Sequence, residues 1–135
     1  MSRELEKLQN KYTSLCRMIF DPAGDFSFQR TPQNDGSTHV EFDGEAYHLV
    51  ATERGLELSR QTTADEEEVL YWLVRDVVFW AAVRYELENR VETQDSRRMI
   101  FMEWRRLIAR CGGEFAERLD AEIDAILKEN PFTDG

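Results

Sequence analysis

The sequence predicts an α+β fold in a single domain, residues 1–135: an N-terminal helix, a small antiparallel meander of three or four strands, a long buried central helix, and two further helices packed against the sheet. Three observations favour this order. Apolar residues recur every three to four positions near the N-terminus and over 64–90, 96–110 and 114–129, which is typical of helices. Between about 25 and 61 the period falls to two and turn residues are frequent, which is typical of strands. A chain of 135 residues has the size of one domain.

The N-terminal segment has the pattern of an amphipathic helix from about Ser2 to Ile19. Ser2 has the side chain of an N-cap residue, and Glu4 lies in the first turn, where the helix dipole favours an acid. The Asp21-Pro22 sequence ends the helix. Its apolar positions are Leu5, Leu8, Tyr12, Leu15, Cys16 and Ile19.

The strand-rich segment contains a hairpin signal. Asp43-Gly44 lies between two short alternating segments, which is typical of a two-residue type I′ turn. With this turn, His39 and His48 would stand directly opposite each other, roughly 5 Å apart, with Glu41 nearby. A zinc site needs three or four protein ligands, and the sequence has no further Cys/His cluster. A solvated cross-strand pair is therefore favoured over a metal site.

The segment 64–90 is predicted to be the central helix. Apolar side chains surround it on almost every side, with Trp80 and Leu87 among them. A helix that is apolar all round is a buried helix. Arg75 and Glu86 share one polar strip, and we expect this strip to face solvent.

Asp76 and Arg97 are charged residues on otherwise apolar helix faces. An unpaired buried charge costs several kcal/mol, so each residue should have a partner. Both point inward from helices joined by a short segment, so we expect them to pair directly or through a shared network. The pair would be a structural staple for the third helix, or the floor of a pocket. On this prediction, Asp76→Ala would destabilise the fold by about 3 kcal/mol or more.

The last two helices have clear end signals. Asp95 is expected to cap the helix 96–110, and Gly112-Gly113 to end it. The helix 114–129 is followed by Asn130-Pro131, which stops it.

The chain is acidic, with a net charge of −10. This charge disfavours unaided binding to nucleic acid or to an anionic membrane, because both need basic surfaces. It favours a basic partner through long-range attraction, although acidity also serves solubility alone. The candidate partner-binding residues are Glu117, Asp120 and Asp124 on one face of the last helix, and Glu41, Asp43 and Glu45 around the hairpin.

Motifs for catalysis or cofactor binding, such as GxGxxG, GxxxxGK[ST], GxSxG and HExxH, are missing. The two cysteines, Cys16 and Cys111, sit on apolar helix faces and form no disulfide framework. The N-terminus lacks an apolar signal core, and no apolar window reaches about 18 residues. The sequence predicts a cytoplasmic protein and disfavours an enzyme, although a general-acid pair of carboxylates stays open, as does the oligomeric state.

Residues 65–133 contain a set of short motifs that look structural rather than catalytic. They are Glu68–Trp72, Asp76, Tyr85–Arg90, Gln94–Arg98, Phe101 and Lys128–Phe132. Through these motifs the segment, roughly half the chain, resembles a bacterial family from polymorphic toxin systems, immunity protein family 63.

The resemblance implies a small protein that is made beside a toxin and neutralises it by stoichiometric binding, without catalysis or a cofactor. A basic toxin, such as a nuclease, would suit the net charge of −10. Two alternatives remain open. One is an adaptor or small-ligand-binding domain with an apolar cavity lined by Trp72 and Trp80. The other is a metal-dependent hydrolase that uses His39 and His48.

Overall fold

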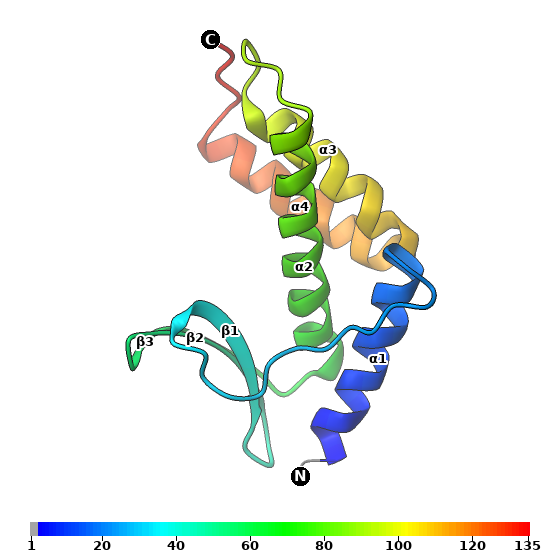
Figure 1. The fold of residues 1–135 in the computed structure, drawn as a ribbon, viewed down its shortest axis with the longest axis vertical. Coiled ribbons are helices and arrows are strands. Elements are labelled where there is room, and N and C mark those ends of the chain that lie inside the picture. The colour runs from blue at the N-terminus through cyan, green and yellow to red at the C-terminus, as the bar shows by residue number, and fades with distance from the viewer. Residues whose placement is uncertain (1–2) are drawn as a thin grey trace. The chain divides into compact units, whose positions relative to one another are not determined.

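The computed structural model describes residues 3–135, so the predicted cap at Ser2 lies outside the described residues. The predicted α+β class and order of elements are confirmed: an N-terminal helix is followed by a three-stranded antiparallel sheet and then by helices. The packing of the last two helices against the sheet stays a prediction. The elements, in chain order, are α1 (Arg3–Ile19), β1 (Asp35–Phe42), β2 (Tyr47–Glu53), β3 (Leu56–Thr63), α2 (Glu66–Glu88), α3 (Ser96–Ile108), the short 3₁₀ helix η1 (Ala109–Cys111) and α4 (Gly113–Glu129) (Figure 1).

The chain divides into two compact units, one up to Leu73 and one from Val74 onward. The boundary falls inside α2, so this helix contributes residues to both units. The assignment of residues 1–135 to a single domain stays a prediction. No helix within residues 3–135 is long and apolar enough to cross a membrane.

The first unit contains α1, the sheet and the first turns of α2. The strands pair in the order β1-β2-β3, with both pairs antiparallel. The predicted apolar stripe of α1 is buried at most of its positions, and Lys11 of α1 forms an ion pair with Glu66 at the start of α2. Burial raises the pKa of the Cys16 thiol to about 11, so this cysteine behaves as a small core side chain.

The two-residue turn of the sheet lies at a different place from the one predicted. Arg54 and Gly55 join β2 to β3, and both have positive φ, 52° and 80°, as a type I′ turn requires. The Asp43-Gly44 signal instead belongs to a four-residue loop, because Phe42 pairs with Tyr47. The Asp43 carboxylate accepts hydrogen bonds from the backbone N–H groups of Glu45 and Ala46, which stabilises the wider loop.

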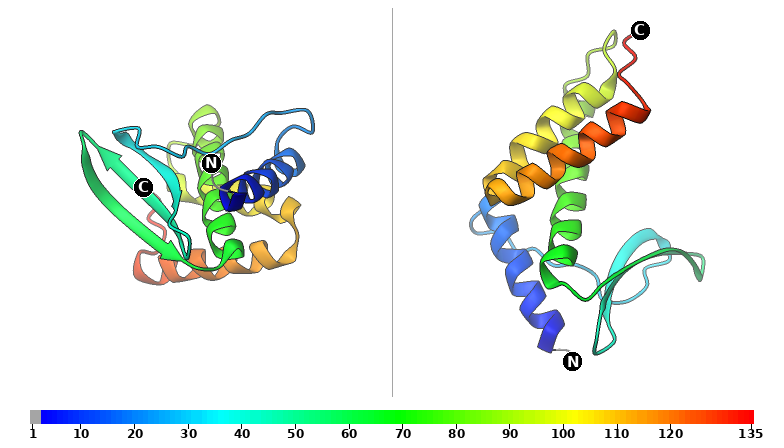
Figure 2. Two further views of the ribbon diagram at one scale, coloured as in Figure 1. Left: turned by 90° about the horizontal axis from the view of Figure 1, so that it is seen from below. Right: turned by 180° about the vertical axis from the view of Figure 1, so that it is seen from behind.

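The second unit is built on α3 and α4, which lie side by side and run in opposite directions (Figure 2, right). Asp95 caps α3 as predicted, since its carboxylate accepts a hydrogen bond from the backbone N–H of Arg97. The Trp104 indole donates a hydrogen bond to the backbone carbonyl of Arg75 on α2, at 3.0 Å. The buried apolar side chains of this unit include Val78 and Ala82 of α2, Phe101, Trp104, Leu107 and Ile108 of α3, and Phe115, Leu119 and Ile123 of α4.

Each unit has a fully buried leucine that should carry a large share of its stability. We expect Leu8→Ala on α1 and Leu119→Ala on α4 each to lower the free energy of unfolding by about 2–5 kcal/mol, because each leaves a cavity in a packed interior. Chemical denaturation monitored by circular dichroism measures the loss. The matched control is Leu56→Ala on the exposed strand β3, which we expect to stay within about 0.5 kcal/mol of wild type.

Candidate functional site

The hairpin histidines do not face each other, so that prediction is wrong. The four-residue loop shifts the register by two, which places His48 opposite Glu41 and His39 opposite Val50. His39 is 1% exposed, and its Nε2 atom lies 2.7 Å from the Glu41 carboxylate. Among the described residues, no group of three or more His, Cys, Asp or Glu side chains is arranged to hold a metal ion.

His48 is held between two polar partners on the sheet. Its Nε2 atom lies 2.8 Å from the Asp43 carboxylate, and its Nδ1 atom lies 2.8 Å from the Thr62 hydroxyl. Together with the backbone N–H donors of the loop, His48 holds the pKa of Asp43 well below its usual value. These contacts fix the loop and the strand pairing, and they engage the charge of Asp43 within the protein.

Glu41 is also engaged within the sheet. It contacts His39 and accepts a hydrogen bond from Arg60, which is itself paired with Glu57. The hydrogen bond with His39 lowers the pKa of Glu41, with a further contribution from Arg60. The neighbouring Glu45 is exposed at the loop. The binding role assigned to Glu41, Asp43 and Glu45 stays a prediction.

The pairing of Asp76 with Arg97 is wrong. Asp76 accepts a hydrogen bond from the adjacent Arg75 at 2.9 Å, and Arg75 also reaches Glu122 of α4 at 3.1 Å. The Asp76 side chain is 40% exposed, so it lies at the edge of the core rather than inside it. Partial burial still raises its pKa, against the opposing effect of Arg75. The partner of Asp76 is its neighbour in the chain, Arg75. The spacing of residues along two helices indicates which way a side chain points, and it does not reveal such a neighbour.

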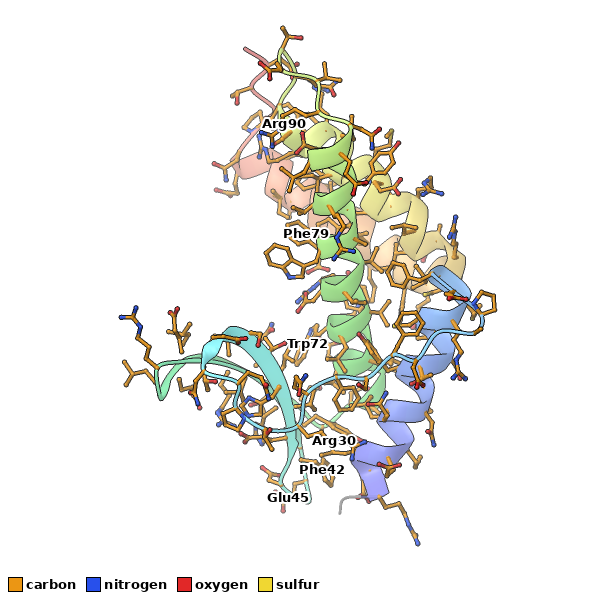
Figure 3. The ribbon with its side chains drawn as sticks, viewed as in Figure 1. Arg30, Phe42, Glu45, Trp72, Phe79 and Arg90 are labelled. Carbon is orange, nitrogen blue, oxygen red and sulfur yellow. The ribbon has the colours of Figure 1, made fainter. Side chains whose placement is uncertain are left out.

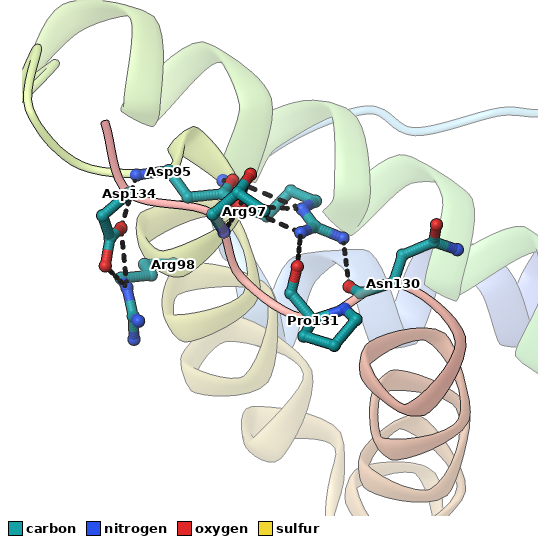
Figure 4. A network of polar contacts seen from close by, with 7 residues as sticks. Asp95, Arg97, Arg98, Asn130, Pro131 and Asp134 are labelled. Atoms are coloured by element: carbon teal, nitrogen blue, oxygen red, sulfur yellow. Dashed lines mark hydrogen bonds and ion pairs between the residues drawn. The ribbon is translucent and has the colours of Figure 1, made fainter.

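Arg97 acts as a staple, but for a different segment from the one predicted. Its guanidinium donates to the Asp95 carboxylate and to the backbone carbonyls of Asn130 and Pro131, both at 2.8 Å (Figure 4). Carbonyl groups near a helix C-terminus lack partners within the helix, so they attract an arginine. Arg97 therefore ties the start of α3 to the chain that follows α4.

The residues after α4, 130–134, form a C-terminal segment that is fastened at several points. Asp134 accepts a hydrogen bond from the backbone N–H of Asp95 and pairs with Arg98 at 3.0 Å. The Phe132 ring lies against Arg98, whose guanidinium carbon is 4.2 Å from the ring centroid. Asp95 also accepts a hydrogen bond from the backbone N–H of Thr133. This network joins the start of α3 to the segment that follows α4.

The acids predicted to form a docking strip on α4 are all exposed. Asp120 pairs with Arg105 of α3 at 3.0 Å, and Asp124 lies 3.6 Å from the same guanidinium. Exposed pairs of this kind contribute little to stability. The docking role of Glu117, Asp120 and Asp124 stays a prediction.

The second half of α2 is open to solvent on its apolar side, contrary to the prediction of a helix buried all round. Trp80 is 64% exposed and Leu87 is 61% exposed, with the half-buried Val83 between them. These three residues, at positions i, i+3 and i+7, form what we call the outward stripe. Figure 3 shows the side chains along α2, where the neighbouring Phe79 and Arg90 are labelled.

The predicted solvent-facing strip of α2 is also wrong, because Glu86 is 2% exposed. Its carboxylate is paired through two hydrogen bonds with Arg90, one turn later. The second half of α2 thus turns a carboxylate inward and a tryptophan outward. The sequence pattern could not reveal this, because a helix with apolar residues on every side does not indicate which side is covered.

A shallow groove follows the outward stripe and is lined by Trp80, Val83, Arg84 and Leu87. Trp80 therefore lies on an open surface. The ligand-binding alternative expected it to line an enclosed cavity, and it does not. Arg84 is exposed, and among the described residues it makes no ion pair. The groove combines a tryptophan, a leucine and an arginine without a carboxylate partner. Trp and Arg are the side chains most enriched at the energetic centres of protein interfaces.

The sequence model of the immunity protein 63 family matches residues 43–125, which is more than half of the chain. The chain belongs to this family. No significant match was found among curated proteins or among solved structures. The family match includes β2, β3, α2 and α3, and so contains the outward stripe, Asp76 and Arg97. The part of the resemblance carried by Lys128–Phe132 lies outside the matched residues.

Because Asp76 pairs with Arg75 and not with Arg97, the loss of stability expected for Asp76→Ala is smaller than the sequence predicted. We expect Asp76→Ala to lower the free energy of unfolding by less than about 1 kcal/mol, because the carboxylate is partly solvated and Arg75 keeps Glu122 as a partner. Arg75→Ala should cost more than Asp76→Ala, since it leaves Asp76 and Glu122 without their shared cation. Denaturant titration of both variants makes the comparison. A loss of about 3 kcal/mol for Asp76→Ala would show that the residue is buried and tightly paired.

The Asp95 network should give stability that depends on pH. Arg97 and the backbone N–H groups of Thr133 and Arg97 hold the pKa of Asp95 well below its ordinary value of 3.8. The ionised group therefore stabilises the folded state above that ordinary pKa, and this contribution is lost as the pH falls toward the lowered pKa. We expect the difference in melting temperature between wild type and Asp95→Asn to be large near about pH 7 and to shrink toward about pH 2.

The control for this experiment is Asp120→Asn, which removes an exposed carboxylate that pairs only across the surface of α3 and α4. Its effect on the melting temperature should be small throughout. Equal, pH-independent effects of the two substitutions would contradict a stabilising role for the ionised Asp95.

Proposed function

We propose that this protein neutralises a cognate bacterial toxin by direct stoichiometric binding, without catalysis. The single observation that carries this proposal is the match to the immunity protein 63 family over residues 43–125. We also propose that the complex forms in the cytoplasm, as expected from the sequence. The alternatives have less support, because His39 and His48 are not opposed and Trp80 lies on an open surface.

The net charge of −10 suits a basic toxin, which it would attract before contact. Exposed charges of this kind act mainly on the rate of association rather than on the lifetime of the complex. Glu45, Glu117, Asp120 and Asp124 are exposed and suited to this role, whereas Glu41 and Asp43 are partly engaged within the hairpin.

The decisive test is co-expression with the toxin encoded beside this gene. We expect growth to be restored by the wild-type protein, and isothermal titration calorimetry with the purified toxin domain to give one-to-one binding. Toxicity that this protein does not relieve, together with no detectable binding, would reject the proposal.

Changes in salt concentration and substitutions of the exposed acids test separately whether electrostatic attraction speeds association. We expect the association rate to fall at least severalfold between about 50 and 500 mM salt, because screening shortens the range of attraction. The triple variant Glu117→Gln, Asp120→Asn, Asp124→Asn should slow association at low salt and leave the dissociation rate nearly unchanged. At high salt the triple variant and wild type should associate at similar rates. Salt-independent association would rule out steering by the acidic surface.

A further inference from the structure

The outward stripe of α2 is not explained by the folding of this chain alone. In the second half of the helix, the inward side carries Glu86, and the outward side carries Trp80 and Leu87. A helix selected only for its own packing would bury Trp80 and Leu87, because burying apolar surface is favourable. Exposed apolar surface that is concentrated in one place marks a contact site.

The size of the stripe argues against a second copy of this chain as its occupant. A fully covered tryptophan buries roughly 150–250 Å², so two copies of this short stripe would bury well below the roughly 1,200 Å² of a stable interface. Two molecules that each carry a charge of −10 also repel each other. A larger partner with a concave apolar surface can enclose Trp80 and Leu87 on several sides.

The charges around the stripe indicate the chemistry of that partner. Asp76 lies one turn before Trp80, and the exposed Glu88 lies one turn after Arg84. The Asp76 side chain itself is 40% exposed and shares Arg75 with Glu122. An apolar centre flanked by two carboxylates, those of the partly exposed Asp76 and the exposed Glu88, fits a partner whose apolar groove has basic groups at its rim. Arg84 adds a hydrogen-bond donor beside the centre.

We propose that the outward stripe of α2, with Trp80 and Leu87 as its anchors, is the surface that docks into an apolar groove with a basic rim on the partner protein. This inference rests on the proposed function, since it takes the cognate toxin as that partner. It assigns the binding energy to α2 and leaves to the acids of α4 and the hairpin loop the role of steering.

The test measures binding of the purified toxin domain encoded beside this gene. We expect Trp80→Ala to weaken binding at least about 30-fold and Leu87→Ala at least about tenfold, mainly through faster dissociation. The matched controls are Leu56→Ala on β3 and Met102→Ala on α3, which remove exposed apolar side chains outside the stripe and should change affinity less than about threefold. Circular dichroism and melting temperature should show that all four variants are folded, because each removes surface side chains.

The outcomes separate this inference from the proposed function. If wild type binds and the stripe variants bind equally well, the stripe is not the docking surface and the proposed function stands. If wild type neither binds nor protects, the proposed function fails and the docking role falls with it. Sedimentation of the protein alone gives a third result: self-association that Trp80→Ala abolishes would overturn the inference in favour of a second copy. A monomer at micromolar concentration agrees with it.

Discussion

The structure depends on how α2 buries its apolar side chains. The first turns, which include Val69, Leu70 and Tyr71, are buried within the unit that holds α1 and the sheet. The later turns bury Val78 and Ala82 within the unit of α3 and α4, and leave the opposite side open. One helix thus supplies core residues to two units. Only its later turns, where Trp80 and Leu87 face solvent, have apolar surface left for a partner.

The charged residues near the core are satisfied mainly by close neighbours in the chain. Asp76 pairs with Arg75, Glu86 with Arg90, and Glu103 with Arg106. Arg75 lies on the same helix as Asp76 and Arg106 on the same helix as Glu103, while Arg90 lies just after the end of α2. Partners so close in the chain do not depend on how distant elements pack. Arg97 shows the longer-range exception, because it uses Asp95 locally and also holds the carbonyls beyond α4. Asp76 and Arg97, which the sequence offered as a staple or as the floor of a pocket, thus each have separate structural partners.

Two kinds of surface residue contribute to the proposed binding of a partner. In our proposal the exposed acids attract a basic partner over a long range, and such attraction tolerates variation in the position of each charge. The outward stripe has apolar area and a tryptophan, and we propose that these side chains hold the partner after contact. Membership of the immunity protein 63 family supports a toxin as the proposed partner, and the exposed Trp80 and Leu87 of α2 support the proposed place of binding.

The sequence by itself determined the order and type of the elements, the cap at Asp95 and the membership of the family, because these depend on local patterns and motifs. It did not determine the hairpin register, since the Asp43 carboxylate favours a wider loop than its Asp-Gly pair suggests. The sequence also did not determine the partners of Asp76 and Arg97. The spacing of residues along a helix indicates the direction of a side chain, but it does not say which residue that side chain contacts. Only the tertiary structure decided that Glu86 is buried and Trp80 is open, since that depends on which side of α2 the other helices cover.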